Sequence, residues 1–293
     1  MTVQTGAFAF PGIAARFAFS GHSDRGAVRR INEDSFVAVP PVFVVADGMG
    51  GHAHGDIASQ TAIAVFTTLF TGVLPPQPQE ILDAIGRAND DVLALSGDDA
   101  SALSGTTLAG VAFVRGEPGD DYRWMAFNVG DSRVYRWDGR TLLQLSVDHS
   151  AVQELVDSGA ITRAQADVHP ERNVVTRALG ADAVVDPDVW LLPVGGRQTF
   201  LICSDGLTKE LGDDDIARII VFHDAAAERA DTGPQPTLPE RLVNAAISAG
   251  GSDNVTVVIV EVDAPGVRAH DVNDDTIDRG PLRASLEETR PRR

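Results

Sequence analysis

The sequence is poor in the features that mark secreted, disulfide-stabilised or membrane-spanning proteins. It has one cysteine in 293 residues, Cys203, so no internal disulfide can form. Its first residues, MTVQTGAFAFPGIAARF, lack the basic start and long apolar run of a signal peptide. No apolar stretch approaches the roughly 20 residues that a membrane helix needs. We therefore expect a cytoplasmic protein without a membrane span.

Positive charge is also scarce. The chain has 24 Lys and Arg residues against 42 Asp and Glu residues, a formal net charge of −18. Such an acidic surface argues against binding nucleic acid or an anionic membrane face. It leaves phosphorylated proteins open as partners, because bound metal cations would reverse the field locally. The length and the 43% hydrophobic content suffice for one large domain or two small ones.

Short apolar runs rich in β-branched residues predict many strands. An Asp138-Gly139 pair between two of them is a strong hairpin signal. The predicted strands are 16–20, 35–39, 42–46, 107–114, 123–128, 134–137, 142–145, 189–192, 200–203 and 255–262.

Apolar residues at helical spacing predict fewer helices, most of them in pairs. Thr237 and Glu240 resemble a capping box, and Gly250-Gly251 would end the helix that they open. The predicted helices are 55–73, 81–92, 152–156, 213–222 and 237–249, with a loop at 225–236. Meandering strands with paired helices indicate an α+β fold, with mostly antiparallel sheets covered by helices.

Acidic residues stand beside several of the predicted strands. Gathered carboxylates repel one another and are costly to desolvate, so they persist where hard divalent cations such as Mg²⁺ or Mn²⁺ bind them. A single Asp beside Gly is ordinary turn chemistry, and spacing alone does not make these residues converge. The residues are Asp47, Asp131 and Asp205 after strands, and Glu33, Asp34 and Asp253 before strands.

Six motifs in order give the chain a specific resemblance. They are SDRGAVRRINEDS (23–35), VVADGMGGHAHGDIAS (44–59), SGTT (104–107), NVGDSRVYR (128–136), CSDGL (203–207) and GGSDNVTVV (250–258). Together they resemble the PP2C family of metal-dependent protein phosphatases, its bacterial branch in particular. The resemblance implies a four-layer αββα sandwich with two mostly antiparallel sheets. It covers the catalytic domain at 16–263, with a flap at about 148–186, and leaves an N-terminal extension at 1–15. Residues 264–293 are charged and poor in apolar residues, so we expect a disordered tail there.

The resemblance also assigns metal ligands. Asp47 should bridge two metal ions, and Gly48 should offer its carbonyl oxygen to one of them. Asp205 and Asp253 should bind the second ion. Asp131, together with Asp205, matches the position of a third, weaker ion. The implied cofactors are two Mn²⁺ or Mg²⁺ ions, with room for a third.

Three further positions follow from the same motifs. Glu33 and Asp34 should support the metal ions through coordinated water. Arg29 stands where the family has its phosphate-binding arginine, although Arg25 and Arg30 are nearby alternatives. A guanidinium can donate two parallel hydrogen bonds to phosphate oxygens, which Lys cannot do in that geometry.

The implied function is hydrolysis of phosphoserine and phosphothreonine on proteins. Two metal ions held by one shared carboxylate can aim a bridging hydroxide in line at phosphorus. The expected partners are phosphorylated proteins, among them bacterial Ser/Thr kinases and their substrates, and we expect a monomer. The alternative is the same fold used as a binding module without turnover. The full set of aspartates together with Arg29 favours activity.

The proton donor to the leaving group is left open by the sequence. Many eukaryotic members of the family have His after the Asp-Gly pair, and this chain has Met49 there. His52, His54 or a water molecule could supply the proton instead. The flap contains His149, His169 and Arg172, which could touch substrate but are more simply parts of a surface loop.

Cysteine-based chemistry is not favoured. A cysteine-dependent phosphatase needs Arg six positions after the cysteine, and this chain has Lys209 there. We predict that Cys203 is a small buried residue on a strand.

Overall fold

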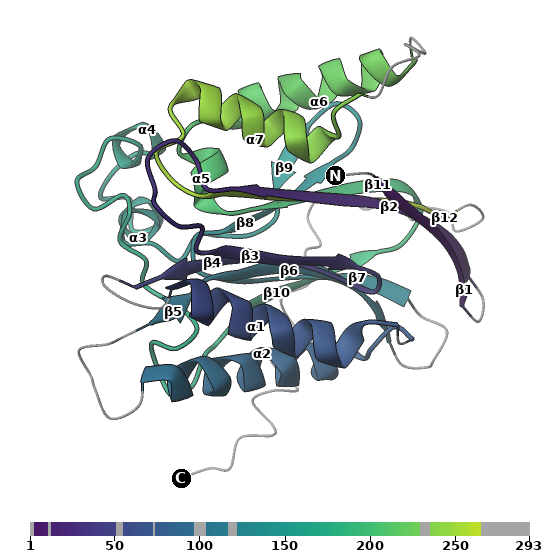
Figure 1. Cartoon of the computed structure of the whole chain (residues 1–293), viewed down its shortest axis with the longest axis horizontal. Coiled ribbons are helices and arrows are strands. Elements are labelled where there is room, and N and C mark those ends of the chain that lie inside the picture. Colours follow the sequence, from purple (N-terminus) through teal and green to yellow (C-terminus); the bar gives the residue numbers. More distant parts are fainter. Residues whose placement is uncertain are drawn as a thin grey trace.

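The computed structural model describes residues 3–10, 13–50, 55–72, 74–96, 104–116, 122–228 and 235–264. Two β-sheets lie face to face, and a pair of helices covers the outer face of each (Figure 1). The predicted α+β class and αββα layering are therefore confirmed. None of the helices in these ranges is long and apolar enough to cross a membrane.

The first sheet is antiparallel throughout. Its hairpin at Asp138-Gly139 is as predicted, since Gly139 has φ +93° and Asp138 accepts hydrogen bonds from the N–H groups of Arg140 and Thr141. In spatial order its strands are β1 (Gln4–Phe10), β2 (Ile13–Asp24), β12 (Val255–Ala264), β11 (Gly196–Cys203), β8 (Arg133–Trp137) and β9 (Leu142–Gln144).

The second sheet is also antiparallel. A short strand, β5 (Gly105–Thr106), pairs with the end of β4. In spatial order its main strands are β10 (Asp188–Pro193), β7 (Tyr122–Val129), β6 (Leu108–Arg115), β4 (Val42–Met49) and β3 (Asp34–Val39).

Four helices form the outer layers. α1 (Gly55–Phe70) and α2 (Pro78–Leu93) bury apolar faces against the second sheet. α6 (Asp213–Glu228) and α7 (Leu238–Ala249) do so against the first. The capping box predicted at Thr237 is present: Thr237 accepts from the Glu240 N–H, and the Glu240 carboxylate accepts from the Thr237 N–H.

Three short helices lie at one end of the sandwich, on the left in Figure 1. They are α3 (Ala151–Asp157), α4 (Arg163–Ala166) and α5 (Asp205–Thr208). Ala94–Ser96 adds one 3₁₀ turn after α2.

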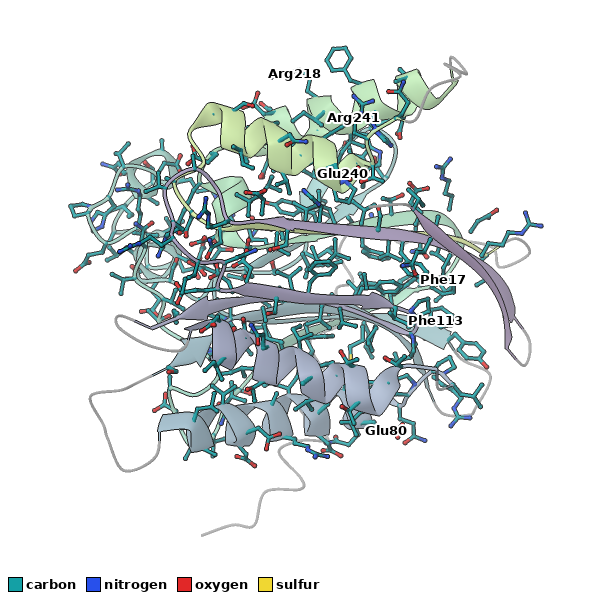
Figure 2. All side chains as sticks on the ribbon, viewed as in Figure 1. Phe17, Glu80, Phe113, Arg218, Glu240 and Arg241 are labelled. Atoms are coloured by element: carbon teal, nitrogen blue, oxygen red, sulfur yellow. The ribbon has the colours of Figure 1, made fainter. Side chains whose placement is uncertain are left out.

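The space between the sheets is filled by aromatic side chains. Phe17 and Phe113 both point into it from opposite sheets, with ring centroids 5.7 Å apart (Figure 2). Trp124 packs on Phe113 at 5.3 Å and on Phe200 at 4.9 Å. This contact joins the two sheets, so the strand ends that carry the acidic residues are held in fixed relative positions.

The structure differs from the sequence predictions in some strands and in some helices. Residues assigned to an N-terminal extension include β1 and the start of β2, which pair along the edge of the first sheet. α6 continues to Glu228, into the predicted loop, because Ala225–Ala227 are good helix formers. α4 and α5, four residues each, are too short to show helical periodicity. The predicted tail lies outside the described residues beyond Ala264.

Replacing Phe113 by Ala should destabilise the protein by about 3–5 kcal/mol, because a fully buried ring between the sheets is lost. Urea unfolding followed by circular dichroism measures the change. Phe222→Ala is the matched control: its side chain is 69% exposed, so we expect a change below about 0.5 kcal/mol. Equal effects of the two substitutions would contradict the core described above.

Candidate active site

Two of the acidic residues are brought together by strand register. Asp34, at the start of β3, lies directly opposite Asp47 in β4. Side chains at opposed positions of antiparallel strands lie on the same face and close together. The Ser204 hydroxyl, which follows β11 of the other sheet, donates to Asp34 Oδ2 at 2.8 Å. The pair therefore sits where the ends of the two sheets meet.

The backbone at Asp47 is held by the SGTT motif. Thr107 Oγ1 accepts from the Asp47 N–H at 3.0 Å, and the Asp47 carbonyl accepts from the Thr107 N–H at 2.9 Å and from Thr106 Oγ1 at 3.0 Å. Gly48 follows in a space closed by backbone: a Cβ there would lie 2.0 Å from the Gly55 carbonyl oxygen. Only glycine fits this close approach.

Asp131, Asp205 and Asp253 reach the same end of the sandwich from three other segments. Asp131 is buried in the turn between β7 and β8, after Gly130 with φ +106°. Asp205 begins α5 directly after β11, and Asp253 immediately precedes β12 with Asn254. Side-chain exposure is only 15% for Asp205 and 14% for Asp253.

The pKa values of four carboxyl groups at this end of the sandwich are raised. Burial, reinforced by the neighbouring carboxylates, raises the pKa of Asp34 and of Asp131 to about 7. The same causes raise the pKa of Asp47 well above its ordinary value and raise the pKa of Asp205. Buried carboxyl groups that interact in this way disfavour one another's ionisation.

The donor set fits divalent cations. Asp34 Oδ1 and Asp205 Oδ1 are buried without a hydrogen-bond partner, which is costly unless another group satisfies them. Carboxylate and carbonyl oxygens are the ligands that Mg²⁺ and Mn²⁺ prefer. Within the described ranges, however, no three His, Cys, Asp or Glu side chains are arranged so as to hold a metal ion. The positions converge, and three of the predicted ligands, Glu33, Asp205 and Asp253, are paired with protein cations.

Two cations make these pairs. Arg29 donates from Nε and Nη2 to the two oxygens of Asp253, at 2.7 and 3.0 Å, and its Nη1 lies 3.9 Å from Glu33 Oε2. Lys209 Nζ contacts Asp205 Oδ2 and Asp253 Oδ2. Burial by itself would raise the pKa of Asp253, but the bonds from Lys209 and Arg29 outweigh it and the pKa is lowered.

Sequence reasoning missed how the loop before β3 is held. Asn254 accepts from the Glu33 N–H at 2.9 Å and donates to the carbonyls of Arg25 and Ile31, each at 2.9 Å. One amide thereby fastens the segment that carries Arg29 and Glu33 to the strand that follows Asp253. Its place inside the GGSDNVTVV motif was the available signal, but spacing does not reveal partners.

The alternatives to Arg29 are placed differently. Arg25 donates to the carbonyl of Arg30 at 3.3 Å, and both side chains are exposed. Arg29 is the one of the three whose guanidinium contacts a predicted metal ligand in the described structure.

Of the three flap residues considered, His149 is buried in the fold, and His169 and Arg172 are not. His149 is buried, accepts from the Gly130 N–H through Nδ1 at 3.0 Å, and has Arg177 Nη1 3.1 Å from Nε2. It therefore supports the turn before Asp131 instead of facing substrate. His169 and Arg172 lie on the outer part of the flap, joined to each other by a backbone hydrogen bond.

The general acid candidates stay open. Met49 is partly buried at the end of β4, and His52 and His54 lie outside the described residues. Cys203 is fully buried on β11, and burial raises the pKa of its thiol, so it is not a nucleophile.

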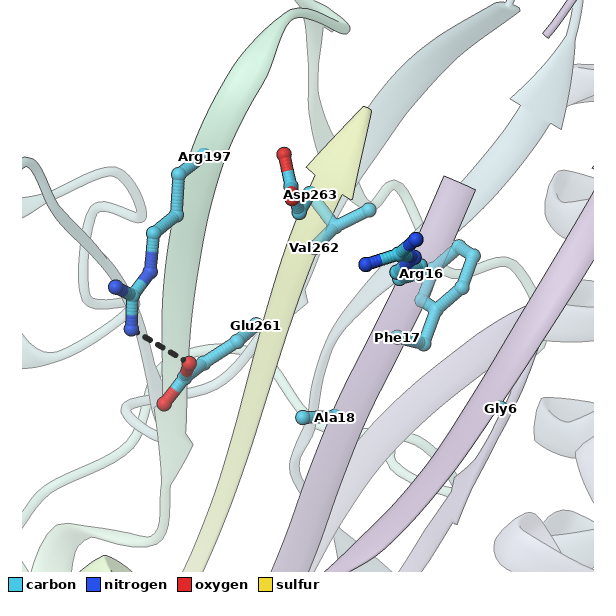
Figure 3. A pocket seen from close by; sticks show the side chains of 8 residues that line it. All are labelled: Gly6, Arg16, Phe17, Ala18, Arg197, Glu261, Val262 and Asp263. Carbon is cyan, nitrogen blue, oxygen red and sulfur yellow. Dashed lines mark hydrogen bonds and ion pairs between the residues drawn. The ribbon is translucent and has the colours of Figure 1, made fainter. Parts of the chain in front are cut away.

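A hollow of about 450 Å³ lies away from these residues, at the opposite end of the first sheet (Figure 3). Its lining includes Arg16, Phe17 and Asp263, and Arg197 pairs across it with Glu261 at 3.0 Å. It contains none of the predicted site residues.

Comparison with known proteins identifies the arrangement. The family model described as "Protein phosphatase 2C" matches residues 30–245. The chain belongs to the protein phosphatase 2C family. It is 33% identical to the serine/threonine phosphatase Stp of Listeria monocytogenes, over 82% of this chain and 94% of that protein. It is 35% identical to PstP of Mycobacterium tuberculosis, over 83% of this chain and 45% of that longer protein.

Solved structures agree. The phosphatase MsPP from Mycobacterium smegmatis, in complex with cacodylate, is 38% identical, with a TM-score of 0.68 over 83% of this chain and 97% of that one. The catalytic domain of PstP in complex with two manganese ions is 32% identical, with a TM-score of 0.70 over 85% and 99%. The predicted family, enzyme class and function as a metal-dependent serine/threonine protein phosphatase are confirmed, and a divalent metal cofactor is supported.

The metal-free protein should be more stable at pH 6 than at pH 8. The pKa of Asp34 and of Asp131 is about 7 in the folded state, above the unfolded value of 3.8. Their contribution is complete below about pH 4 and is lost as the pH rises through about 7. We expect a melting temperature in EDTA about 3 °C or more higher at pH 6, measured by differential scanning fluorimetry.

The double variant Asp34→Asn/Asp131→Asn supplies the control, because its neutral amides do not titrate. Its melting temperature in EDTA should depend less on pH than that of the wild type. With Mn²⁺ the wild-type trend should reverse, since metal ligands must be ionised. Identical pH profiles of wild type and double variant in EDTA would refute the assignment.

Proposed function

We propose that the chain hydrolyses phosphoserine and phosphothreonine on proteins with Asp47, Asp205 and Asp253 as metal ligands. The observation that carries this proposal is the gathering of buried, mutually repelling carboxyl groups, two with unpartnered oxygens, where the two sheets meet. Burial of this kind is unfavourable for a protein unless a cation offsets it. The Stp and PstP relatives are serine/threonine phosphatases, which supports the substrate class.

The proposed ligand set follows the strand ends. Asp47, Asp205 and Asp253, together with the Gly48 carbonyl oxygen, would hold two ions. Asp131 with Asp205 would hold a third, and Glu33 and Asp34 would orient water beside them. When bound, Mn²⁺ or Mg²⁺ supplies an activated water nucleophile and neutralises phosphate charge.

The chain's own residues position the substrate. Arg29 has a 47% exposed side chain and comes from a loop that Asn254 holds in place, so its guanidinium lies at the rim of the carboxylate cluster. Its Nη1 lies 3.9 Å from Glu33 Oε2 and is turned away from the Asp253 carboxylate that Nε and Nη2 contact. We propose that this edge of Arg29 donates to the non-bridging phosphate oxygens. The proton for the leaving alkoxide comes from His52, His54 or water, because the Met49 side chain carries none.

The catalytic domain extends to residue 263, and its segment 148–186 is the flap beside the site. The partners are phosphorylated proteins, among them bacterial Ser/Thr kinases and their substrates, and the protein acts as a cytoplasmic monomer.

Phosphate release from a phosphothreonine peptide tests the reaction directly. The wild type should release phosphate with Mn²⁺ and should lose this activity in EDTA. Asp47→Asn should reduce the rate to the level of the EDTA sample, because an amide cannot bridge two cations as a carboxylate does. A folded wild type that binds Mn²⁺ without turnover on any phosphopeptide would favour a binding module instead.

Arg29→Lys tests the phosphate contact separately. The variant keeps the charge but loses the two-pronged donor, so kcat/KM should fall by about 10- to 100-fold. Arg30→Lys, one position along the same loop, is the matched control and should stay within about twofold of the wild type. Steady-state kinetics with the same peptide measures both. An Arg29→Lys enzyme as efficient as Arg30→Lys would remove Arg29 from the proposal.

A further inference from the structure

One lysine joins two of the proposed metal ligands. Lys209 Nζ lies 2.5 Å from Asp205 Oδ2 and 2.8 Å from Asp253 Oδ2. The Lys209 side chain is 27% exposed, and the two carboxylates are 15% and 14% exposed. The ammonium is therefore a partly buried cation between carboxylates that reach it from α5 and from the loop before β12.

Local structure fixes this placement. Lys209 follows Asp205 by one helical turn, and its N–H donates to the Asp205 carbonyl at 2.8 Å. Residues four apart on a helix lie on the same face, so the Lys209 side chain starts beside that of Asp205. The next residue, Glu210, accepts from the Ser252 N–H and hydroxyl at 2.8 and 2.6 Å. The end of α5 thus holds the loop carrying Asp253 through two adjacent side chains.

Arg29 does not have the same position. It binds Asp253 through both carboxylate oxygens from the solvent side, with its side chain 47% exposed. Of the two described cations that contact Asp253, only Lys209 also contacts Asp205. Lys209 is thus the cation that offsets the repulsion between the two ligands assigned to the second metal ion.

An ammonium and a divalent ion compete for these oxygens. Each cation must lie in direct contact with the same carboxylate oxygens, and two cations held that close repel each other. We propose that Lys209 is a built-in counter-ion of the second metal position, which holds Asp205 and Asp253 together before a metal ion binds and lowers the affinity for that ion. This inference rests on the metal ligands of the proposed function. In this role Lys209 sets the metal affinity and does not contact the substrate.

The test is a calorimetric titration of the full chain with MnCl₂ after chelation, together with thermal unfolding in EDTA. Lys209→Met removes the charge and keeps a similar side-chain length. The dissociation constant of the lower-affinity Mn²⁺ site should therefore fall about tenfold, which means tighter binding. In EDTA the same variant should melt below the wild type, because the two carboxylates lose their cation. Lys209→Gln carries the same expectation for Mn²⁺ affinity and keeps a hydrogen-bond donor, in case Lys209→Met does not fold.

Two controls separate charge from position. Lys209→Arg keeps the cation and should retain near-wild-type Mn²⁺ affinity. Arg218→Met removes one positive charge from an exposed pair on α6 and should change neither measurement. Tighter Mn²⁺ binding in the two neutral variants alone supports the inference. Equal or weaker binding in both overturns it and makes Lys209 a clamp of the loop, while the metal site stands. A wild type that binds no Mn²⁺ overturns the metal site itself and this inference with it.

Discussion

Repulsion among carboxyl groups at one end of the sandwich is the constraint around which the rest of the structure is arranged. Burial raises the pKa of Asp34, Asp47, Asp131 and Asp205, and repulsion from neighbouring carboxylates adds to the effect. The cluster opposes folding of the metal-free chain, so other interactions must hold it. The aromatic core between the two sheets and the helices on both outer faces supply these interactions.

Hydrogen bonds close to the cluster fix the positions of its backbone and side chains. Thr106 and Thr107 hold the backbone of Asp47, Ser204 holds Asp34 from the opposite sheet, and Asn254 holds the loop of Arg29. Each of these residues acts on a neighbour and carries no charge. Polar contacts of this kind are the support that functional groups need if they are to keep a defined geometry.

The distribution of charge around the cluster is uneven. Arg29 lies at the exposed rim of the cluster, and Lys209 lies between two of the carboxylates. The chain carries a net charge of −18, so neither cation reflects a generally basic surface. Positive charge is placed locally: one cation at the rim of the carboxylate cluster and one between two of its members. A protein of this composition attracts phosphorylated partners only through such local cations and bound metal.

The amino-acid sequence by itself determined most of the strands, the paired helices and the family, because apolar periodicity and ordered motifs are local properties. The capping box at Thr237 and the hairpin at Asp138-Gly139 were likewise visible, since each lies within a few residues. Only the tertiary structure decided that Asp34 stands opposite Asp47, that Asn254 fastens the Arg29 loop, and that Lys209 bridges Asp205 and Asp253. The contacts of Asn254 with the Arg29 loop and of Lys209 with Asp253 join segments far apart in the chain. Sheet register and packing decide them, and neither can be read from residue spacing.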